Sequence, residues 1–205
     1  MKLFIRVIIA SLILGITSWV IIQLPSVQDR LLVVAFSALG SASSNLPKED
    51  ALSAVVCGSR SPIPSPGRAE TCILISAGED LFVVDIGDGS NDNLRSWNIN
   101  FRNIEAVLIT HLHSDHIADL PGLHQNAWVI GERSSKLKVF GPEGVDQFTQ
   151  GIEMAYAHDY VFRNEHHGDA IAPLEYAGFD TNVIDLNNPV IFDNCLLYTS
   201  DAADD

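Results

Sequence analysis

The residues best suited to chemistry lie in one seven-residue segment, Thr110-His111-Leu112-His113-Ser114-Asp115-His116, which follows a short apolar run typical of a strand. Side chains two residues apart on an extended segment point the same way, so His111 and His113 can face one metal ion. Asp115 and His116 lie where the chain turns into the next predicted helix, and they can face a second ion. Imidazole nitrogens with one carboxylate suit Zn²⁺ and, less well, Mn²⁺ or Fe²⁺.

Chance is a poor explanation of this pattern. The chain has only 7 His among 205 residues, and the four-residue pattern should arise by chance in about one such chain in 1,500. A purely structural zinc is disfavoured, because such sites prefer cysteine and fill all four positions. Two adjacent ions can instead share one hydroxide and hold the attacking and leaving oxygens of an ester during hydrolysis.

The segment resembles the metal-binding motif of the metallo-β-lactamase superfamily, in particular the branch that contains ribonuclease Z and the arylsulfatase-like hydrolases. The resemblance runs from about Leu52 to Asn194. Four further stretches support it: Cys57–Pro62, Val84–Gly87, Phe140–Gly144 and Tyr160–Gly168. The last of these is similar to a stretch in exported or membrane-anchored bacterial members.

The resemblance implies a fold, a cofactor and residue roles. The fold class would be α/β (α+β layered), as the N-terminal part of an αββα sandwich whose site lies at one edge between two sheets. His111 and His113 would bind the first of two Zn²⁺ ions, and Asp115 and His116 the second. Asp115 would also accept a proton from the metal-bound water, which leaves the hydroxide that acts as the nucleophile. Asp85 would lie beneath the site and orient the ligands, where the alternative is a solvated strand-end carboxylate.

The remaining histidines and two tryptophans are interpreted differently. His158, His166 and His167 are not at matching ligand positions. A loop at His166 and His167 could bring them towards the site, but a surface or ligand-orienting role is favoured over direct metal binding. His124, in the predicted helix after the motif, is interpreted as structural. The two remaining large aromatic candidates, Trp97 and Trp128, are interpreted as core residues rather than a substrate platform.

Short apolar runs alternate with helical patterns along the rest of the chain, which predicts α/β or α+β layering. The strands are expected at Ala54–Cys57, Thr71–Ser76, Leu81–Asp85, Ala106–Thr110 and Leu137–Phe140, the second and third forming a hairpin. The helices are expected at Asn93–Asn98, Ile117–Ile130 and Glu143–Tyr156.

The N-terminus carries an apolar run, Val7–Leu24, preceded by Lys2 and Arg6. Eighteen helical residues span about 27 Å, close to the thickness of a bilayer core. We expect a retained signal anchor, with a cleaved signal peptide as the alternative, and both export the soluble domain to the periplasm or the extracellular space. The predicted organisation is a transmembrane helix (1–28), a juxtamembrane helix and linker (29–50), a partial metallo-β-lactamase domain (51–194) and a tail (195–205).

The tail Cys195–Asp205 resembles a translated sequencing-adaptor artefact, with a genuine acidic tail as the alternative. The family pattern requires further ligands that the sequence up to Asn194 does not contain. We therefore expect a fragment that is inactive by itself. Three cysteines exclude a disulfide scaffold. Cys57 and Cys72 could pair in an oxidising compartment, or remain buried thiols.

Charge bears on the substrate. Twelve basic against 26 acidic residues give a net charge of −14, which argues against a nucleic-acid partner. The main hypothesis is a membrane-anchored, metal-dependent hydrolase of a small phosphoester, sulfate ester or related ester. The alternatives are a ribonuclease Z-like endonuclease that processes tRNA 3′ ends, and a non-catalytic membrane-anchored binding module. Relatives often dimerise, so a homodimer is possible.

Overall fold

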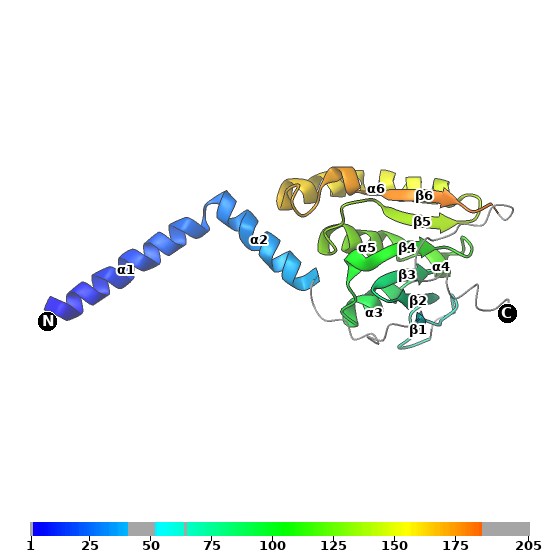
Figure 1. Cartoon of the computed structure of the whole chain (residues 1–205), viewed down its shortest axis with the longest axis horizontal. Helices are drawn as coiled ribbons and strands as arrows, with labels where there is room; N and C mark the ends of the chain where they lie inside the picture. Colours follow the sequence, from blue (N-terminus) through cyan, green and yellow to red (C-terminus); the bar gives the residue numbers. More distant parts are fainter. Residues whose placement is uncertain (1, 41–51, 64, 186–205) are drawn as a thin grey trace.

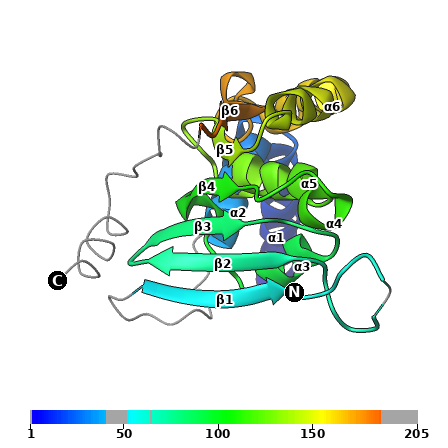
Figure 2. The same cartoon turned by 90° about the vertical axis from the view of Figure 1, so that its right-hand side faces the viewer.

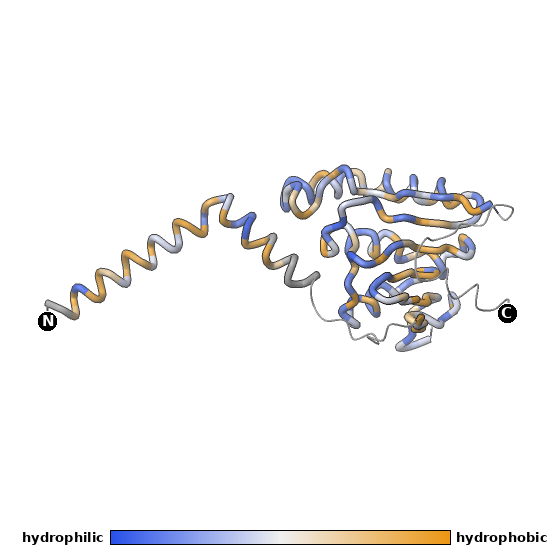
Figure 3. Tube along the Cα trace, in the orientation of Figure 1, coloured by the Kyte–Doolittle hydropathy of each residue, from blue (hydrophilic) through white to orange (hydrophobic). Residues whose placement is uncertain are grey.

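The structure, a computed structural model, describes residues 2–40, 52–63 and 65–185. It begins with two successive helices, α1 (Lys2–Ile22) and α2 (Pro25–Gly40), of which α1 extends away from the folded domain and α2 lies between α1 and the domain (Figure 1). Within α1, residues Phe4–Ile22 form the one candidate membrane span in the described part of the chain, with a mean hydropathy of 2.3 and no buried residue. Apolar residues dominate the length of α1 (Figure 3). The predicted helix beyond Pro25 is therefore confirmed, whereas the linker and the tail of the predicted organisation lie largely or wholly outside the described residues.

The domain is built on a six-stranded sheet whose strands follow one another in chain order. The strands are β1 (Leu52–Gly58), β2 (Cys72–Ala77), β3 (Asp80–Val84), β4 (Ile104–Leu108), β5 (Leu137–Gly141) and β6 (Phe179–Val183). The first three pair antiparallel, and β3 to β6 pair parallel. The predicted hairpin is confirmed, with a two-residue turn in which Gly78 has φ +63°. The mixed sheet confirms the predicted α/β class.

Helices connect and cover the strands. They are α3 (Ser90–Ser96), α4 (Ser114–Ile117), α5 (Leu120–Gln125) and α6 (Val145–His167), with short 3₁₀ turns at Phe101–Asn103 and Leu174–Tyr176 and a π-helical turn, η2, at Asn126–Ile130. Figure 2 shows α3, α5 and α6 on one side of the sheet. The parallel strands need such crossover connections, because the end of one strand and the start of the next lie at opposite edges of the sheet.

The main core lies between the sheet and these helices. Val83, Val107 and Val139 on successive strands are fully buried in the same cluster as Leu94 of α3 and Leu123 of α5. A second cluster surrounds Trp128, and Leu32 of α2 packs against it. Trp128 and His124 are fully buried and Trp97 packs partly buried on the main core, so these three structural interpretations are confirmed.

The helix predicted at Ile117–Ile130 is in fact three pieces, α4, α5 and η2. Asp119 leaves helical geometry between α4 and α5, and Pro121 starts α5 without a backbone N–H to continue the earlier hydrogen-bond series. As a result, α4 contains Asp115 and His116 and ends at Ile117, one residue after the last candidate ligand.

The last predicted helix is longer than expected, because α6 continues to His167 and Gly168, at φ +76°, ends it. His166 and His167 therefore lie on the last turn of a helix and not on a loop. Since α6 starts after the carboxyl end of β5 and runs back along the sheet, its last turn lies at the opposite edge from the motif (Figure 1). The alternative of a loop that brings these two histidines towards the site was therefore wrong.

The two cysteines of the first strands form a disulfide. Cys57 and Cys72 are fully buried, with Cα atoms 5.0 Å apart on the neighbouring strands β1 and β2. A register shift between Val56 and Gly58 places Cys57 next to its partner. The alternative of two free thiols is therefore set aside, and the loop between these strands is closed at its base.

Candidate metal centre

The candidate ligands lie just beyond the carboxyl end of β4. The backbone of Ile109 still pairs with the end of β5, through its N–H and the carbonyl of Phe140 at 2.7 Å. The chain stays extended to His113, at φ −72° and ψ 148°, and then enters α4 at Ser114. This change from strand to helix gives successive residues of the motif different directions, as the sequence predicted.

His111 and His113 form the first pair of candidate ligands. Their side chains come together, with His111 Nε2 and His113 Nδ1 3.0 Å apart and ring centroids 4.7 Å apart. His113 is exposed and His111 is partly buried. The alternation of an extended segment thus brings two imidazole nitrogens to one point, as predicted.

Asp115 and His116 form the second pair. Asp115 is buried, with 7% of its surface exposed, and its Oδ2 lies 3.7 Å from His116 Nε2. The rings of His111 and His116 have centroids 3.9 Å apart, so the two pairs are neighbours. The structure therefore brings all four predicted ligand residues together at one end of the sheet.

Asp85 lies beneath these pairs, directly after β3. Its carboxylate is 3% exposed and accepts hydrogen bonds from Thr110 N (2.8 Å), Thr110 Oγ1 (2.7 Å) and His116 Nδ1 (2.8 Å). A histidine whose Nδ1–H donates to a carboxylate keeps its proton there and presents the lone pair of Nε2. These contacts are the ones that an orienting residue would make, and the solvated alternative does not fit the burial of Asp85.

Thr110 connects Asp85 to the first pair. Its hydroxyl donates to Asp85 and lies 3.1 Å from His111 Nδ1. With its hydrogen directed to the carboxylate, Thr110 Oγ1 can accept the Nδ1–H of His111, which leaves Nε2 of His111 facing His113. From the sequence, Thr110 is predicted only as the end of a strand. Its position between a strand end and the first histidine was the available signal.

Close backbone contacts hold the turn after β3 against the second pair. The amide of Ile86 donates to the carbonyl of His116 at 2.7 Å. At Gly87, a Cβ atom would lie 2.1 Å from the carbonyl oxygen of Asp115, closer than any real side chain allows. Glycine is therefore required at position 87, because any side chain there would push the turn after β3 away from the backbone of Asp115.

The spacing of the candidate donor atoms fits zinc coordination. Two ligands at about 2.05 Å from a tetrahedral ion lie about 3.3 Å apart, and the two donor pairs have separations of 3.0 and 3.7 Å. Each pair therefore fits two corners of an ion site. Among the described residues, however, no group of three or more His, Cys, Asp or Glu side chains is arranged around one ion. The described part of the chain brings together two candidate ligand pairs and no closed site.

Two titratable groups near the motif have shifted pKa values. Burial raises the pKa of Asp119, which follows the motif and accepts the Asn91 N–H at 3.0 Å. Burial also lowers the pKa of His124 to about 3, so this residue is a neutral core histidine at physiological pH. Its Nε2 accepts the N–H of Gly178 at 3.1 Å.

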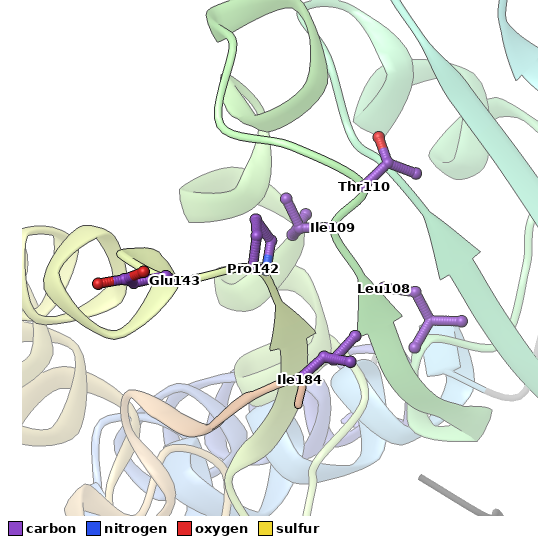
Figure 4. Close-up of a pocket in the computed structure, with 6 residues that line it drawn as sticks. All are labelled: Leu108, Ile109, Thr110, Pro142, Glu143 and Ile184. Atoms are coloured by element: carbon purple, nitrogen blue, oxygen red, sulfur yellow. The ribbon is translucent and has the colours of Figure 1, made fainter. Parts of the chain in front are cut away.

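A cavity of about 440 Å³ adjoins the motif at the carboxyl ends of β4 and β5. Its walls are largely aliphatic, with Glu143 as the charged residue (Figure 4), and it is lined by Leu108, Ile109, Thr110, Pro142, Glu143 and Ile184. Thr110 belongs both to this cavity and to the hydrogen-bond system of Asp85. The cavity is therefore continuous with the backbone that carries the ligand pairs.

Comparison with known proteins identifies the family to which the chain belongs. The sequence profile described as the metallo-beta-lactamase superfamily matches residues 65–186, more than half of the chain. Ribonuclease Z of Mycobacterium bovis is 36% identical over 124 residues, which are 60% of this chain and 44% of that protein. Ribonuclease Z of Mycobacterium marinum is 37% identical over 118 residues, 57% of this chain and 42% of that protein.

The chain thus spans less than half the length of these curated relatives. Among solved structures, a long form RNase Z from yeast has a TM-score of 0.51 at 15% identity, over 68% of this chain and 19% of that one, which supports the fold alone. Membership of the matched superfamily implies metal ions, typically zinc. On the profile match and the shared fold, the chain belongs to the metallo-beta-lactamase superfamily, and within it is similar to the ribonuclease Z branch.

Proposed function

We propose that the protein of which these residues are part is a metal-dependent hydrolase of phosphoester, sulfate ester or related ester bonds. The observation that carries the proposal is the pair of two-ligand groups, His111 with His113 and Asp115 with His116, at neighbouring positions above one buried carboxylate. Two Zn²⁺ ions bound there would supply a nucleophile at neutral pH and stabilise negative charge on the substrate.

The chain's own residues would perform three tasks. His111 and His113 would hold the first ion, and Asp115 and His116 the second, each through nitrogen or oxygen atoms left free by the hydrogen bonds described above. Asp85 would keep the Nε2 of His116 unprotonated for this purpose. Asp115 would also accept a proton from the attacking water, since this residue is 7% exposed and its carboxylate belongs to the second candidate ligand pair.

The test is the substitution His113→Ala in the full-length protein. Because His113 is exposed, its removal should leave the melting temperature nearly unchanged, while hydrolysis of a chromogenic phosphodiester or sulfate ester falls by at least about 100-fold. His158→Ala, an exposed histidine of α6, is the matched control and should keep full activity. Unchanged hydrolysis in His113→Ala would contradict the proposed roles.

A second candidate activity is endonucleolytic processing of tRNA 3′ ends. The observation that favours it is the 36% identity to proteins named ribonuclease Z. The net charge of −14 weighs against it. A comparison of the full-length protein on a tRNA precursor and on small chromogenic esters distinguishes the two activities, and metal binding without hydrolysis of either would favour a non-catalytic binding module.

The N-terminal helix supports a membrane-anchored protein with its domain outside the cytoplasm. Residues Phe4–Ile22 have the length and composition of a membrane span. The buried Cys57–Cys72 disulfide is consistent with an oxidising compartment. Protease added to intact cells and to spheroplasts would test this location: a periplasmic domain is degraded only in spheroplasts, and a cytoplasmic domain is protected in both.

A further inference from the structure

The loop between β1 and β2, residues 59–71, is fixed at its base. The Cys57–Cys72 disulfide joins the two strands, and the amides of Ser59 and Arg60 both donate to the carbonyl of Ala69, at 3.0 and 2.9 Å. The two ends of the loop are therefore held side by side. This loop does not contain a candidate ligand, and the proposed function gives it no role.

The end of this loop binds the turn after β3. Glu70 N donates to the Asp88 carbonyl at 2.8 Å, and Gly87 N donates to the Thr71 carbonyl at 2.9 Å. The side chain of Glu70 adds a third contact, because its Oε2 accepts the Asp88 N–H at 3.1 Å. The same turn touches the second ligand pair, through the close approach of Gly87 to the carbonyl of Asp115.

Arg60 pairs with a carboxylate on each side of this contact, Glu70 in the loop and Asp88 in the turn after β3. Its Nη2 lies 3.2 Å from Glu70 Oε1 and 3.2 Å from Asp88 Oδ2. The side chains of Arg60 and Glu70 are 15% and 12% exposed, so this ion pair is mostly removed from water. The Asp88 side chain is 70% exposed, so water screens its charge and the pair of Arg60 with Glu70 is the stronger of the two contacts.

We propose that Arg60 is a positioning residue for the Asp115–His116 pair. It acts through Glu70 and the Gly87–Asp88 backbone, which supports the backbone of the second ligand pair. The inference rests on the proposed metal site and assigns a role to a loop outside it. It predicts that loss of Arg60 weakens the binding of one ion and spares the other.

The direction of the change in metal affinity on loss of Arg60 distinguishes a positioning role from a direct electrostatic effect of its charge. Arg60 is a cation near a site for cations, so removal of its charge alone should strengthen metal binding by Coulomb's law. Removal of a positioning contact should weaken it, and loss of an outer contact to a metal ligand typically costs 10- to 100-fold in affinity. The two explanations therefore predict opposite directions.

The experiment measures Zn²⁺ binding to the full-length protein by competition with a chelator, together with the imidazole ¹⁵N signals of His111, His113 and His116. For Arg60→Ala we expect one of two stepwise affinities to fall at least about tenfold, with altered signals from His116 alone. Arg60→Lys, which keeps a positive charge at this position, should restore part of the affinity. Arg102→Ala removes a guanidinium that pairs with Glu132 at 2.8 Å, and this matched control should bind both ions normally.

Two results would overturn the inference: unchanged or tighter metal binding in Arg60→Ala, or equal weakening in Arg60→Ala and Arg102→Ala. If Arg60→Ala does not fold, Glu70→Gln tests the same contact, since its amide oxygen can still accept the Asp88 N–H while the ion pair is lost. It should weaken the same ion. Absence of metal binding in the unsubstituted protein would instead contradict the proposed function itself.

Discussion

The substitution Asp85→Asn tests the candidate metal centre at its hydrogen-bond base. Asparagine has the same shape as aspartate and tolerates the left-handed conformation of this residue, φ +57°. It differs in that one oxygen becomes an NH₂ group, which donates instead of accepting. The oxygen that accepts the Thr110 N–H can be kept, so the NH₂ group must face His116 and the Thr110 hydroxyl.

That exchange reverses the tautomer of His116. Its Nδ1 lies 2.8 Å from Asp85 Oδ2, and opposite an NH₂ group this nitrogen would have to accept. The ring proton then moves to Nε2, which loses the lone pair that a metal ion requires. We expect metal affinity to fall 10- to 100-fold, about 1.4 to 2.7 kcal/mol. Exchange of charge-assisted hydrogen bonds for neutral ones should also cost folding stability, on the order of 1–3 kcal/mol.

The assay is a chelator-competition titration of the full-length protein, with the imidazole ¹⁵N shifts of His116 read in the metal-free state to identify the tautomer. Asp180→Asn, an exposed carboxylate of β6, is the control and should change neither quantity. Wild-type metal affinity in Asp85→Asn would refute the reasoning, and so would weakened binding with the His116 proton still on Nδ1.

Two further predictions concern stability. The pKa of His124 is about 3 in the folded protein against an ordinary value of 6.5, so as pH falls the unfolded state takes up the proton first. The contribution of neutral His124 to the free energy of unfolding is therefore fully present above pH 6.5. It is lost as pH falls towards 3, by about 1.4 kcal/mol per pH unit. Urea unfolding at pH 7.5 and 5.5 should show this loss, and His124→Gln should reduce it. Reduction of the Cys57–Cys72 disulfide, which closes a loop with a sequence separation of 15, should remove about 3 kcal/mol of stability, measured as a lower melting temperature with reductant; a protein lacking both cysteines should not respond.

Local patterns predicted the parts of the fold that depend on neighbouring residues. The β2–β3 hairpin follows from two apolar runs around a glycine turn, and the direction of His111 and His113 follows from strand alternation. The pattern at Ile117–Ile130 gave the correct buried face, including Leu120 and Leu123, but not the breaks, because a helical period persists across a short interruption.

Contacts between distant segments were beyond such patterns. The length of α6 was underestimated because its second half exposes Val161 and Phe162 and so lacks a clear amphipathic period. The sequence could not decide between a disulfide and two free thiols, because pairing of Cys57 with Cys72 depends on the register of β1 against β2. The sequence gives no signal for the contacts of Arg60, since its ion-pair partners are 10 and 28 positions away in the chain.

The site itself depends on the pairing of β3 with β4 more than on the histidine motif. In this parallel pair Val84 lies opposite Leu108, so the residues that follow both strands emerge at the same edge of the sheet. Asp85 N then pairs with the Leu108 carbonyl at 2.9 Å, and the Asp85 carboxylate reaches Thr110 and His116. A register shift of one residue would turn the carboxylate to the other face of the sheet. The four ligand residues would then keep their spacing in the sequence, yet nothing would fix the proton of His116 away from the metal, so ligand spacing alone is insufficient for this centre.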